Sequence, residues 1–247
     1  MRHQPLTMRT LSLLSTIAAV LFFSSCQKPR FESEPKPKED IFTWLATVKD
    51  SCSYTIDGKV YICDHLGGTG WANRGTNLDT SNGEWKWHPD SLLYSTKFEF
   101  FSIKDNRSDN GNFHLEFTKK YGKNQLAPKI GTMLAPATDT VLYAKGLHKF
   151  AVEFDRFNND EGVVLTMHNW TGSSFETLST NSQAPVSWPT TISPRSHNNS
   201  EFEIVKVQPL PYNYRGHIIE ARFSASVFDK QEQAKRVDGY VRFRIDQ

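Results

Sequence analysis

Apolar and polar residues alternate over long stretches of this chain, most strictly toward its C-terminus. The apolar positions there are Ile219, Ala221, Phe223, Ala225, Val227, Val241, Phe243 and Ile245. Such alternation is typical of antiparallel strands that have one packed face and one solvated face. Arg222, Arg242 and Arg244 fall on the solvated face, where we expect Glu220 and other carboxylates of the sheet to pair with them.

Similar patterns predict strands earlier in the chain. The predicted strands are residues 98–103, 113–118, 150–154, 163–167 and 202–204. Two stretches, 64–92 and 171–200, are rich in Gly, Asn, Ser and Pro and are expected to be long loops. Residues 40–48 predict a short helix or turn, with a first strand as the alternative.

The sequence shows no β-α-β alternation, no fixed-period repeat and no long amphipathic helix. An all-β, mainly antiparallel domain is therefore expected. Strands of uneven spacing, interrupted by long loops, favour a β-sandwich. A lipocalin-like barrel is the alternative.

The N-terminus has the pattern of an export signal. Residues 1–25 carry Arg2 and Arg9 before an apolar run, which is shorter than the ~20 residues that a membrane-spanning helix needs. Residues 26–39 contain several prolines and mixed charges, and they predict a flexible tether. Residues 40–247 are expected to fold as a single domain.

The stretch LFFSSC, which ends in Cys26, resembles the lipobox of bacterial lipoproteins, although Phe23 stands where an aliphatic residue is usual. The resemblance implies that Cys26 carries lipid, palmitate included, and becomes the mature N-terminus. The protein would then be anchored to a membrane of the cell envelope, with the outer membrane expected and its periplasmic or surface face left open. Ordinary secretion, with Cys26 as a bystander, is the alternative.

The stretch CSYTIDGKVYIC predicts a tight β-hairpin. Asp57-Gly58 fits a type I′ turn, in which both central residues need positive φ. The turn pairs Tyr54 with Tyr61 and Cys52 with Cys63. Directly opposed Cα atoms lie within or near disulfide reach, and two cysteines remaining in an oxidising compartment favour a bond between them. Two reduced, buried thiols are the alternative.

Two segments resemble lipid-anchored lipoproteins of Bacteroidota, a family of unknown function. CSYTIDGKVYICD looks like their opening hairpin. GHIIEARF at 216–223 and DGYVRFRI at 238–245 look like their two closing strands. The resemblance implies a β-sandwich on a lipid anchor and transfers no catalytic residue.

The balance of basic and acidic residues argues against nucleic acid as the main partner. Without Arg2 and Arg9, which lie in the segment expected to be removed, 27 basic residues face 27 acidic ones. Nucleic-acid binding would need a basic stripe on the folded surface.

The sequence contains no H-E-x-x-H, G-x-S-x-G or Walker A motif, so we assign no catalytic residue, metal or cofactor. Tryptophans lie in or beside the polar loops: Trp71, Trp85, Trp87, Trp170 and Trp188. Such a ring can stack on a sugar while nearby amides and carboxylates bond its hydroxyls. Alternatively, each ring folds back as the loop's own small core. Trp85 and Trp87 are the best pair, because residues two apart on an extended segment project to the same side.

These observations predict a non-catalytic binding or scaffold module whose ligand is a glycan or another protein. One alternative is a glycan-active hydrolase with dispersed carboxylates, because a catalytic pair of carboxylates need not be close in sequence. Another is an adhesive or assembly component that pairs through sheet edges. Facing carboxylates would favour the enzyme, an aromatic platform would favour glycan binding, and an uncapped edge strand would favour assembly.

Overall fold

The computed structural model describes residues 50–74, 77–79, 84–86, 90–102, 111–130, 133–137, 141–152, 161–171, 174–183, 190–210 and 216–246. All of them belong to one unit, Leu45–Gln247. The predicted signal peptide, Cys26, the tether and the element at 40–48 lie outside the described residues. Among the described residues, no helix has the length and apolar character needed to span a membrane.

The described residues form strands and short 3-10 turns. The strands are β1 (Ser51–Ile56), β2 (Lys59–Cys63), β3 (His65–Arg74), β4 (Asn77–Asp79), β5 (Glu84–Lys86), β6 (Ser91–Phe101), β7 (Gly111–Gly122), β8 (Leu126–Ile130), β9 (Met133–Pro136), β10 (Gly146–His148), β11 (Gly162–Thr171), β12 (Ser174–Ser179), β13 (Glu201–Pro209), β14 (Gly216–Phe228) and β15 (Ala234–Asp246). The turns are η1 (Lys123–Gln125) and η3 (Pro194–His197).

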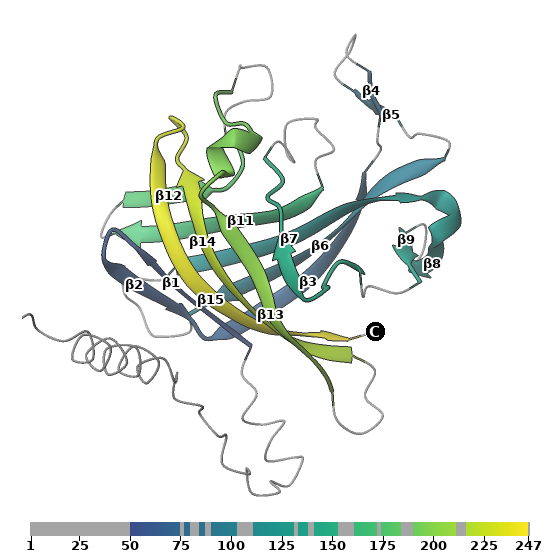
Figure 1. Cartoon of the computed structure of the whole chain (residues 1–247), viewed down its shortest axis with the longest axis horizontal. Helices are drawn as coiled ribbons and strands as arrows, with labels where there is room; N and C mark the ends of the chain where they lie inside the picture. The colour runs from purple at the N-terminus through teal and green to yellow at the C-terminus, as the bar shows by residue number, and fades with distance from the viewer. Residues whose placement is uncertain are drawn as a thin grey trace, which may run out of the picture. The chain divides into compact units, whose positions relative to one another are not determined.

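Most of these strands join one antiparallel sheet in the order β2-β1-β15-β14-β12-β11-β7-β6-β3, with β13 pairing beside β14 and β10 beside β13. Figure 1 shows the strands curving around a shared interior. The prediction of an all-β, mainly antiparallel domain is confirmed. The single sheet is nearly closed, which is compatible with the barrel alternative.

The interior is filled by aromatic rings from opposite parts of the curved sheet. Phe98 of β6 meets Phe243 of β15 with ring centroids 4.4 Å apart. Phe113 of β7 stacks on Phe223 of β14 at 5.4 Å. Each ring is at an inward position of its strand, as the alternation predicts, and burial of such large apolar surfaces is the main stabilising term of the fold.

The predicted hairpin is confirmed in turn type and register. Asp57 and Gly58 have φ values of 51° and 77°, as a type I′ turn requires. Tyr54 pairs with Tyr61 and Cys52 pairs with Cys63.

The predicted disulfide is not formed in this structure, because Cys52 and Cys63 are both free thiols. The Cys63 Sγ atom points across the interior and donates a hydrogen bond to the Gly111 carbonyl oxygen of β7 at 3.2 Å. Burial raises the pKa of Cys63 to about 12 and raises that of Cys52 well above its usual value. Both thiols are therefore protonated at neutral pH, as in the alternative of two reduced, buried cysteines.

The two predicted long loops are partly strands. The stretch 64–92 contains β3 and the start of β6, and the stretch 171–200 contains β12. Glycines lower strand propensity, but Gly68 and Gly70 lie on the outward face of β3, so they remove no side chain from the core. The strand predicted at 150–154 is reduced to an isolated bridge at Phe150 among the described residues.

One irregular segment spans the gap between β13 and β11. β10 pairs with β13, and the chain then exchanges two backbone hydrogen bonds with Val163 at the start of β11. Gly162 has a φ of 144° there, and a Cβ atom on it would collide with the Lys149 carbonyl oxygen. Glycine is thus required at this crossing.

Candidate functional site

A cavity occupies the place where the sheet fails to close, and we call it the seam cavity. β1 begins at Ser51 opposite Arg242, so the last residues of β15 extend beyond it. β3 ends the sheet on its other side. The cavity between them has a volume of about 450 Å³, and its lining includes Asp50, Thr69, Trp71, Thr96, Tyr143 and Arg244.

An ion pair between a buried aspartate and a partly exposed arginine lies at one side of the seam cavity. The Arg244 Nε and Nη2 atoms both lie 3.1 Å from Asp50 Oδ2. Arg244 was expected to pair with a carboxylate of the sheet, and it pairs instead with a residue that precedes β1. Asp50 is only 8% exposed. The guanidinium thus supplies two donors to this buried oxygen.

Two polar atoms of the seam cavity have no hydrogen-bond partner within the part of the chain that the structure describes. They are Asp50 Oδ1 and Thr96 Oγ1. A buried polar atom without a partner costs about 1–3 kcal/mol. A ligand that reached these atoms, after a shift of the side chains that bury them, would remove this cost by donating to Asp50 and exchanging a hydrogen bond with Thr96.

Trp71 brings an aromatic surface to the seam cavity and is 36% exposed. The Lys129 Nζ atom lies 4.8 Å from the centroid of its ring and does not line the cavity. Asn73 fixes the strand beside it, because its amide accepts from the Leu134 backbone N–H and donates to the Leu134 carbonyl, each at 2.8 Å. β3 is thus held against β9, and the indole has a defined place.

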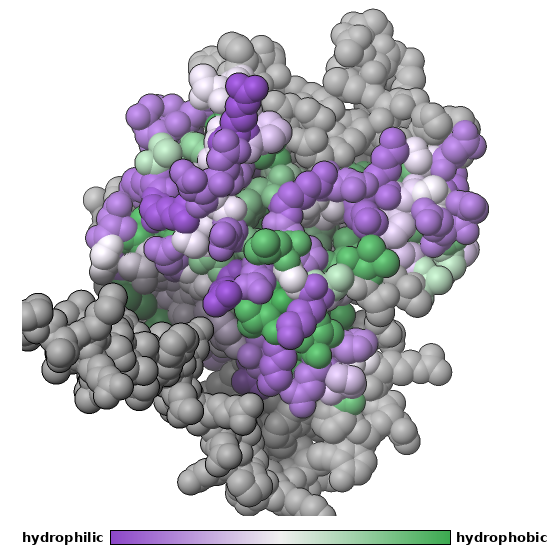
Figure 2. Space-filling model, in the orientation of Figure 1, coloured by the Kyte–Doolittle hydropathy of each residue, from purple (hydrophilic) through white to green (hydrophobic). Residues whose placement is uncertain are grey.

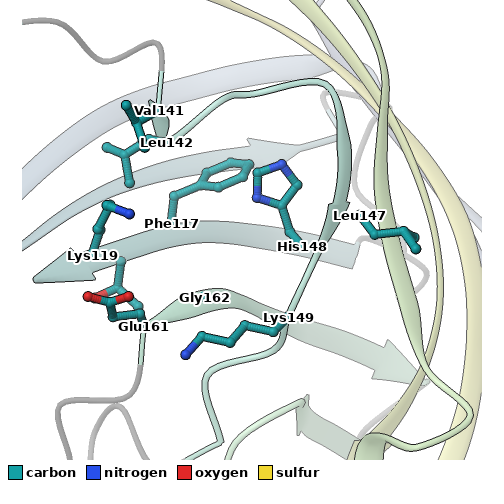
Figure 3. A pocket seen from close by; sticks show the side chains of 10 residues that line it. Phe117, Lys119, Val141, Leu142, Leu147, His148, Lys149, Glu161 and Gly162 are labelled. Carbon is teal, nitrogen blue, oxygen red and sulfur yellow. The ribbon is translucent and has the colours of Figure 1, made fainter.

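A smaller hollow lies beside the crossing segment, and we call it the bridge pocket (Figure 3). It has a volume of about 190 Å³ and is lined by Lys119, Lys149 and Glu161, with His148 against Phe117. The His148 Nε2 atom lies 2.7 Å from the Ala144 carbonyl oxygen, and Glu161 Oε1 accepts from the Lys120 N–H at 3.0 Å. His148 and Glu161 are thus already engaged, whereas Thr118 Oγ1, which also belongs to the lining, has no partner within the described residues.

Apolar residues surround this region on the outside. Figure 2 shows hydrophobic residues gathered near the centre of the face in view, in front of β13, with hydrophilic residues around them. Val141 and Leu147, which line the bridge pocket, are exposed.

Neither hollow has the carboxylate pair of a glycosidase. Among the described residues, Asp50 is the only carboxylate that lines the seam cavity, and Glu161 is the only one that lines the bridge pocket. Glycoside hydrolysis ordinarily needs two carboxylates, one on each side of the scissile bond. In the described residues, no group of three or more His, Cys, Asp or Glu side chains is arranged to hold a metal ion.

Among the tryptophans singled out in the sequence, Trp71 is the one that the described structure places in a cavity. Trp87 and Trp188 lie outside the described residues. Trp85 is in β5 and Trp170 in β11, with side chains outside the description. Sequence reasoning missed the residues that line the seam cavity together with Trp71, namely Asp50, Thr96 and Arg244. An aspartate before a strand and a threonine within one carry no local signal of binding.

Comparison of the chain with protein-family models, with curated proteins and with solved structures finds no match.

Proposed function

We propose that this protein is a lipid-anchored lipoprotein of the cell envelope whose β domain binds a saccharide in the seam cavity without transforming it. The observation that carries the binding proposal is the presence, in one cavity, of a partly exposed Trp71 with unpartnered buried oxygens of Asp50 and Thr96. The anchor is supported by the lipobox-like stretch that ends in Cys26.

A saccharide fits the chemistry of this cavity. The C–H face of a sugar ring packs on an indole, while its hydroxyls both donate and accept hydrogen bonds. Asp50 Oδ1 accepts from one hydroxyl, the Arg244 guanidinium donates to another, and the Thr96 hydroxyl does either. A volume of about 450 Å³ is within the range of small-ligand sites, where a few polar groups orient an otherwise packed ligand.

The non-catalytic assignment is supported by the single carboxylate. Asp50 Oδ2 lies 3.1 Å from Arg244 Nη2, so this oxygen is already engaged as a hydrogen-bond acceptor. Within the part of the chain that the structure describes, the cavity lining contributes no second carboxylate to act as the complementary acid, base or nucleophile.

The binding proposal is tested with Thr96→Val on a glycan array and by calorimetry with the glycans that score. Valine keeps the shape of threonine and removes a hydroxyl that has no partner, so we expect the melting temperature to be unchanged or higher. Affinity should fall about three- to tenfold, as for one lost hydrogen bond. Thr118→Val is the matched control, because Thr118 Oγ1 is also buried without a partner but lines the bridge pocket. Equal affinity of the two variants, or no glycan binding by the wild type, would contradict the proposal.

The anchor is tested separately with Cys26→Ala. In a detergent phase separation the wild type should partition with the detergent and the variant with the aqueous phase. Unchanged partitioning of the variant would refute lipidation at Cys26 and would leave the cavity argument as it stands.

A further inference from the structure

A second hollow lies on the outward side of β3, and we call it the outer groove. Its volume is about 400 Å³. Its lining includes Gly70, Ala72, Ser95, Lys97, His114 and Thr166. The proposal for the seam cavity uses none of these residues.

The outer groove crosses four strands. Gly70 of β3 pairs with Lys97 of β6, Lys97 pairs with Glu116 of β7, and Glu116 pairs with Val164 of β11. These four residues all line the hollow. With neighbouring strands about 4.8 Å apart, the row is about 14 Å long, which is longer than a single sugar ring.

The β3 side of the groove is hollow because its side chains are small. Gly70 and Ala72 of β3, with Ser95 opposite Ala72 on β6, leave the backbone close to the surface. A Cβ atom built on Gly70 meets nothing within 4 Å, so the space in front of this residue is free of protein atoms. Glycine is not required by the backbone there, since Gly70 is not among the residues with positive φ.

The rings beside the groove are held uncharged. The ring centroids of His114 and His168 lie 4.8 Å apart, and the His168 ring in turn stacks on the Phe175 ring. Burial, with help from the nearby Lys97 ammonium and from His168, lowers the pKa of His114 to about 4. At neutral pH this imidazole thus offers one N–H donor and one acceptor nitrogen, the pairing that a sugar hydroxyl satisfies.

The groove has charged groups of both signs. Lys97 forms an ion pair with Glu99 at 2.8 Å, and the groove lining adds Glu116. A groove with charges of both signs and a neutral imidazole suits an uncharged, hydroxyl-rich chain better than a polyanion or a basic peptide.

Trp71 lines both hollows, so the outer groove and the seam cavity meet at this residue of the edge strand. We infer that the protein binds an oligosaccharide chain, with one unit in the seam cavity and the following units passing Trp71 into the outer groove. This inference rests on the proposed saccharide binding and adds the length and the path of the ligand.

The test fills the groove without disturbing the fold. Gly70→Leu places a side chain in the free space and should leave the melting temperature unchanged or raise it, because glycine is a poor strand residue. Gly68→Leu is the matched control, because Gly68 is outward on the same strand, meets nothing within 4 Å, and does not line the groove. The probes are cello-, xylo-, malto- and chito-oligosaccharides, from single sugars to hexasaccharides, measured by calorimetry.

Affinity of the wild type should rise with chain length. Gly70→Leu should abolish that rise, costing the longer chains about tenfold in affinity, which corresponds to one or two lost hydrogen bonds, and should not affect single sugars. Gly68→Leu should behave as the wild type. In an NMR titration, the His114 ring protons should shift with the longer chains only.

The outcomes separate the two proposals. Suppose that binding depends on Thr96 but does not strengthen with chain length, or that Gly70→Leu leaves it unchanged. Either result overturns the proposal for the outer groove and keeps the proposal for the seam cavity. If binding strengthens with chain length and is weakened by Gly70→Leu but not by Thr96→Val, the proposal for the seam cavity is overturned. Absence of binding by the wild type to every probe overturns both.

Discussion

On the outward face of β13, β14 and β15, charged side chains of neighbouring strands are paired with one another. The Arg222 Nη2 atom lies 2.6 Å from Glu203 Oε2. Glu220 Oε1 lies 3.4 Å from Lys206 Nζ and 3.8 Å from Arg242 Nε. The pairing predicted from the sequence for Arg222 and Arg242 is confirmed. This face is covered by long charged side chains that form ion pairs with one another.

The outward face of β3, β6 and β7 has a different construction. Gly70, Ala72 and Ser95 leave a hollow there, and His114 borders it as an uncharged ring. Both faces have polar, outward positions, so alternation in the sequence does not distinguish them. Side-chain length therefore decides whether a polar sheet face is covered by its own side chains or forms a groove that can bind a ligand.

The largest expected effect compares glycine-to-alanine substitutions in the two parts of the sheet. A Cβ atom on Gly239 of β15 would collide with the Phe223 ring and lie 2.7 Å from the Ser53 carbonyl oxygen. Gly239→Ala should therefore lower the free energy of unfolding by about 1–3 kcal/mol or more. Gly70→Ala, which enters free space, should change it by less than about 0.5 kcal/mol. Urea denaturation measures the free energy of unfolding of both variants. Equal losses would contradict the difference that we describe between the two faces of the sheet.

The next effect concerns a buried hydrogen bond that joins β1 to β11 across the interior. The Tyr54 hydroxyl of β1 donates to Asn169 Oδ1 of β11 at 2.7 Å, and both residues are buried. Tyr54→Phe leaves the Asn169 oxygen without this donor and should cost about 1–3 kcal/mol. Tyr240→Phe, at a 38% exposed position of the paired face, is the control and should cost much less. Similar losses for the two variants would mean that the hydrogen bond does not hold the sheet together.

Acid should affect the groove face through His114. Its folded pKa of about 4 is below the ordinary value of 6.5, so the unfolded chain binds the proton more readily between these values. The contribution of His114 to stability is thus fully present above about pH 6.5 and is lost as the pH falls toward 4. An NMR titration of the folded protein should show the His114 ring titrating near pH 4, and His114→Gln should remove this part of the pH dependence. A midpoint near 6.5 would contradict the burial of the ring.

The smallest effect is expected on the paired face. Arg222→Ala breaks the ion pair with Glu203, but the arginine side chain is 70% exposed, and such surface pairs are worth about 0–1 kcal/mol. Oligosaccharide affinity should not change. A loss of affinity in Arg222→Ala would show that the paired face, and not only the groove face, contacts the ligand.

Local signals in the sequence predicted the elements whose geometry is decided locally. The Asp57-Gly58 turn fixes the register of the first hairpin within twelve residues, and the alternation in β14 and β15 fixes their inward faces. β3 was expected to be a loop, because its glycines resemble loop composition. It is a strand because the backbone of β6 supplies its hydrogen bonds, and that pairing is tertiary information.

The candidate site was predicted in one residue only. Trp71 stood out because a tryptophan in a glycine-rich stretch is conspicuous. Asp50 and Arg244 are 194 positions apart and meet only because β15 runs beyond the start of β1. No spacing rule connects two such residues, and the same holds for the outer groove, whose lining comes from four strands.

The pairing of β1 with β15 also has a consequence for how the chain folds. β1 is the first of the described strands to be synthesised, and one of its two neighbours in the sheet, β15, is the last of them. Until that strand arrives, one edge of the first hairpin is unpaired, and the pair of Asp50 with Arg244 does not exist. Contacts so distant along the chain form slowly, because much of the loop-closure entropy is lost before they form. Ligand binding is therefore expected to appear late, only after synthesis of the whole domain, and truncation of the last few residues should abolish it while leaving the first hairpin able to form.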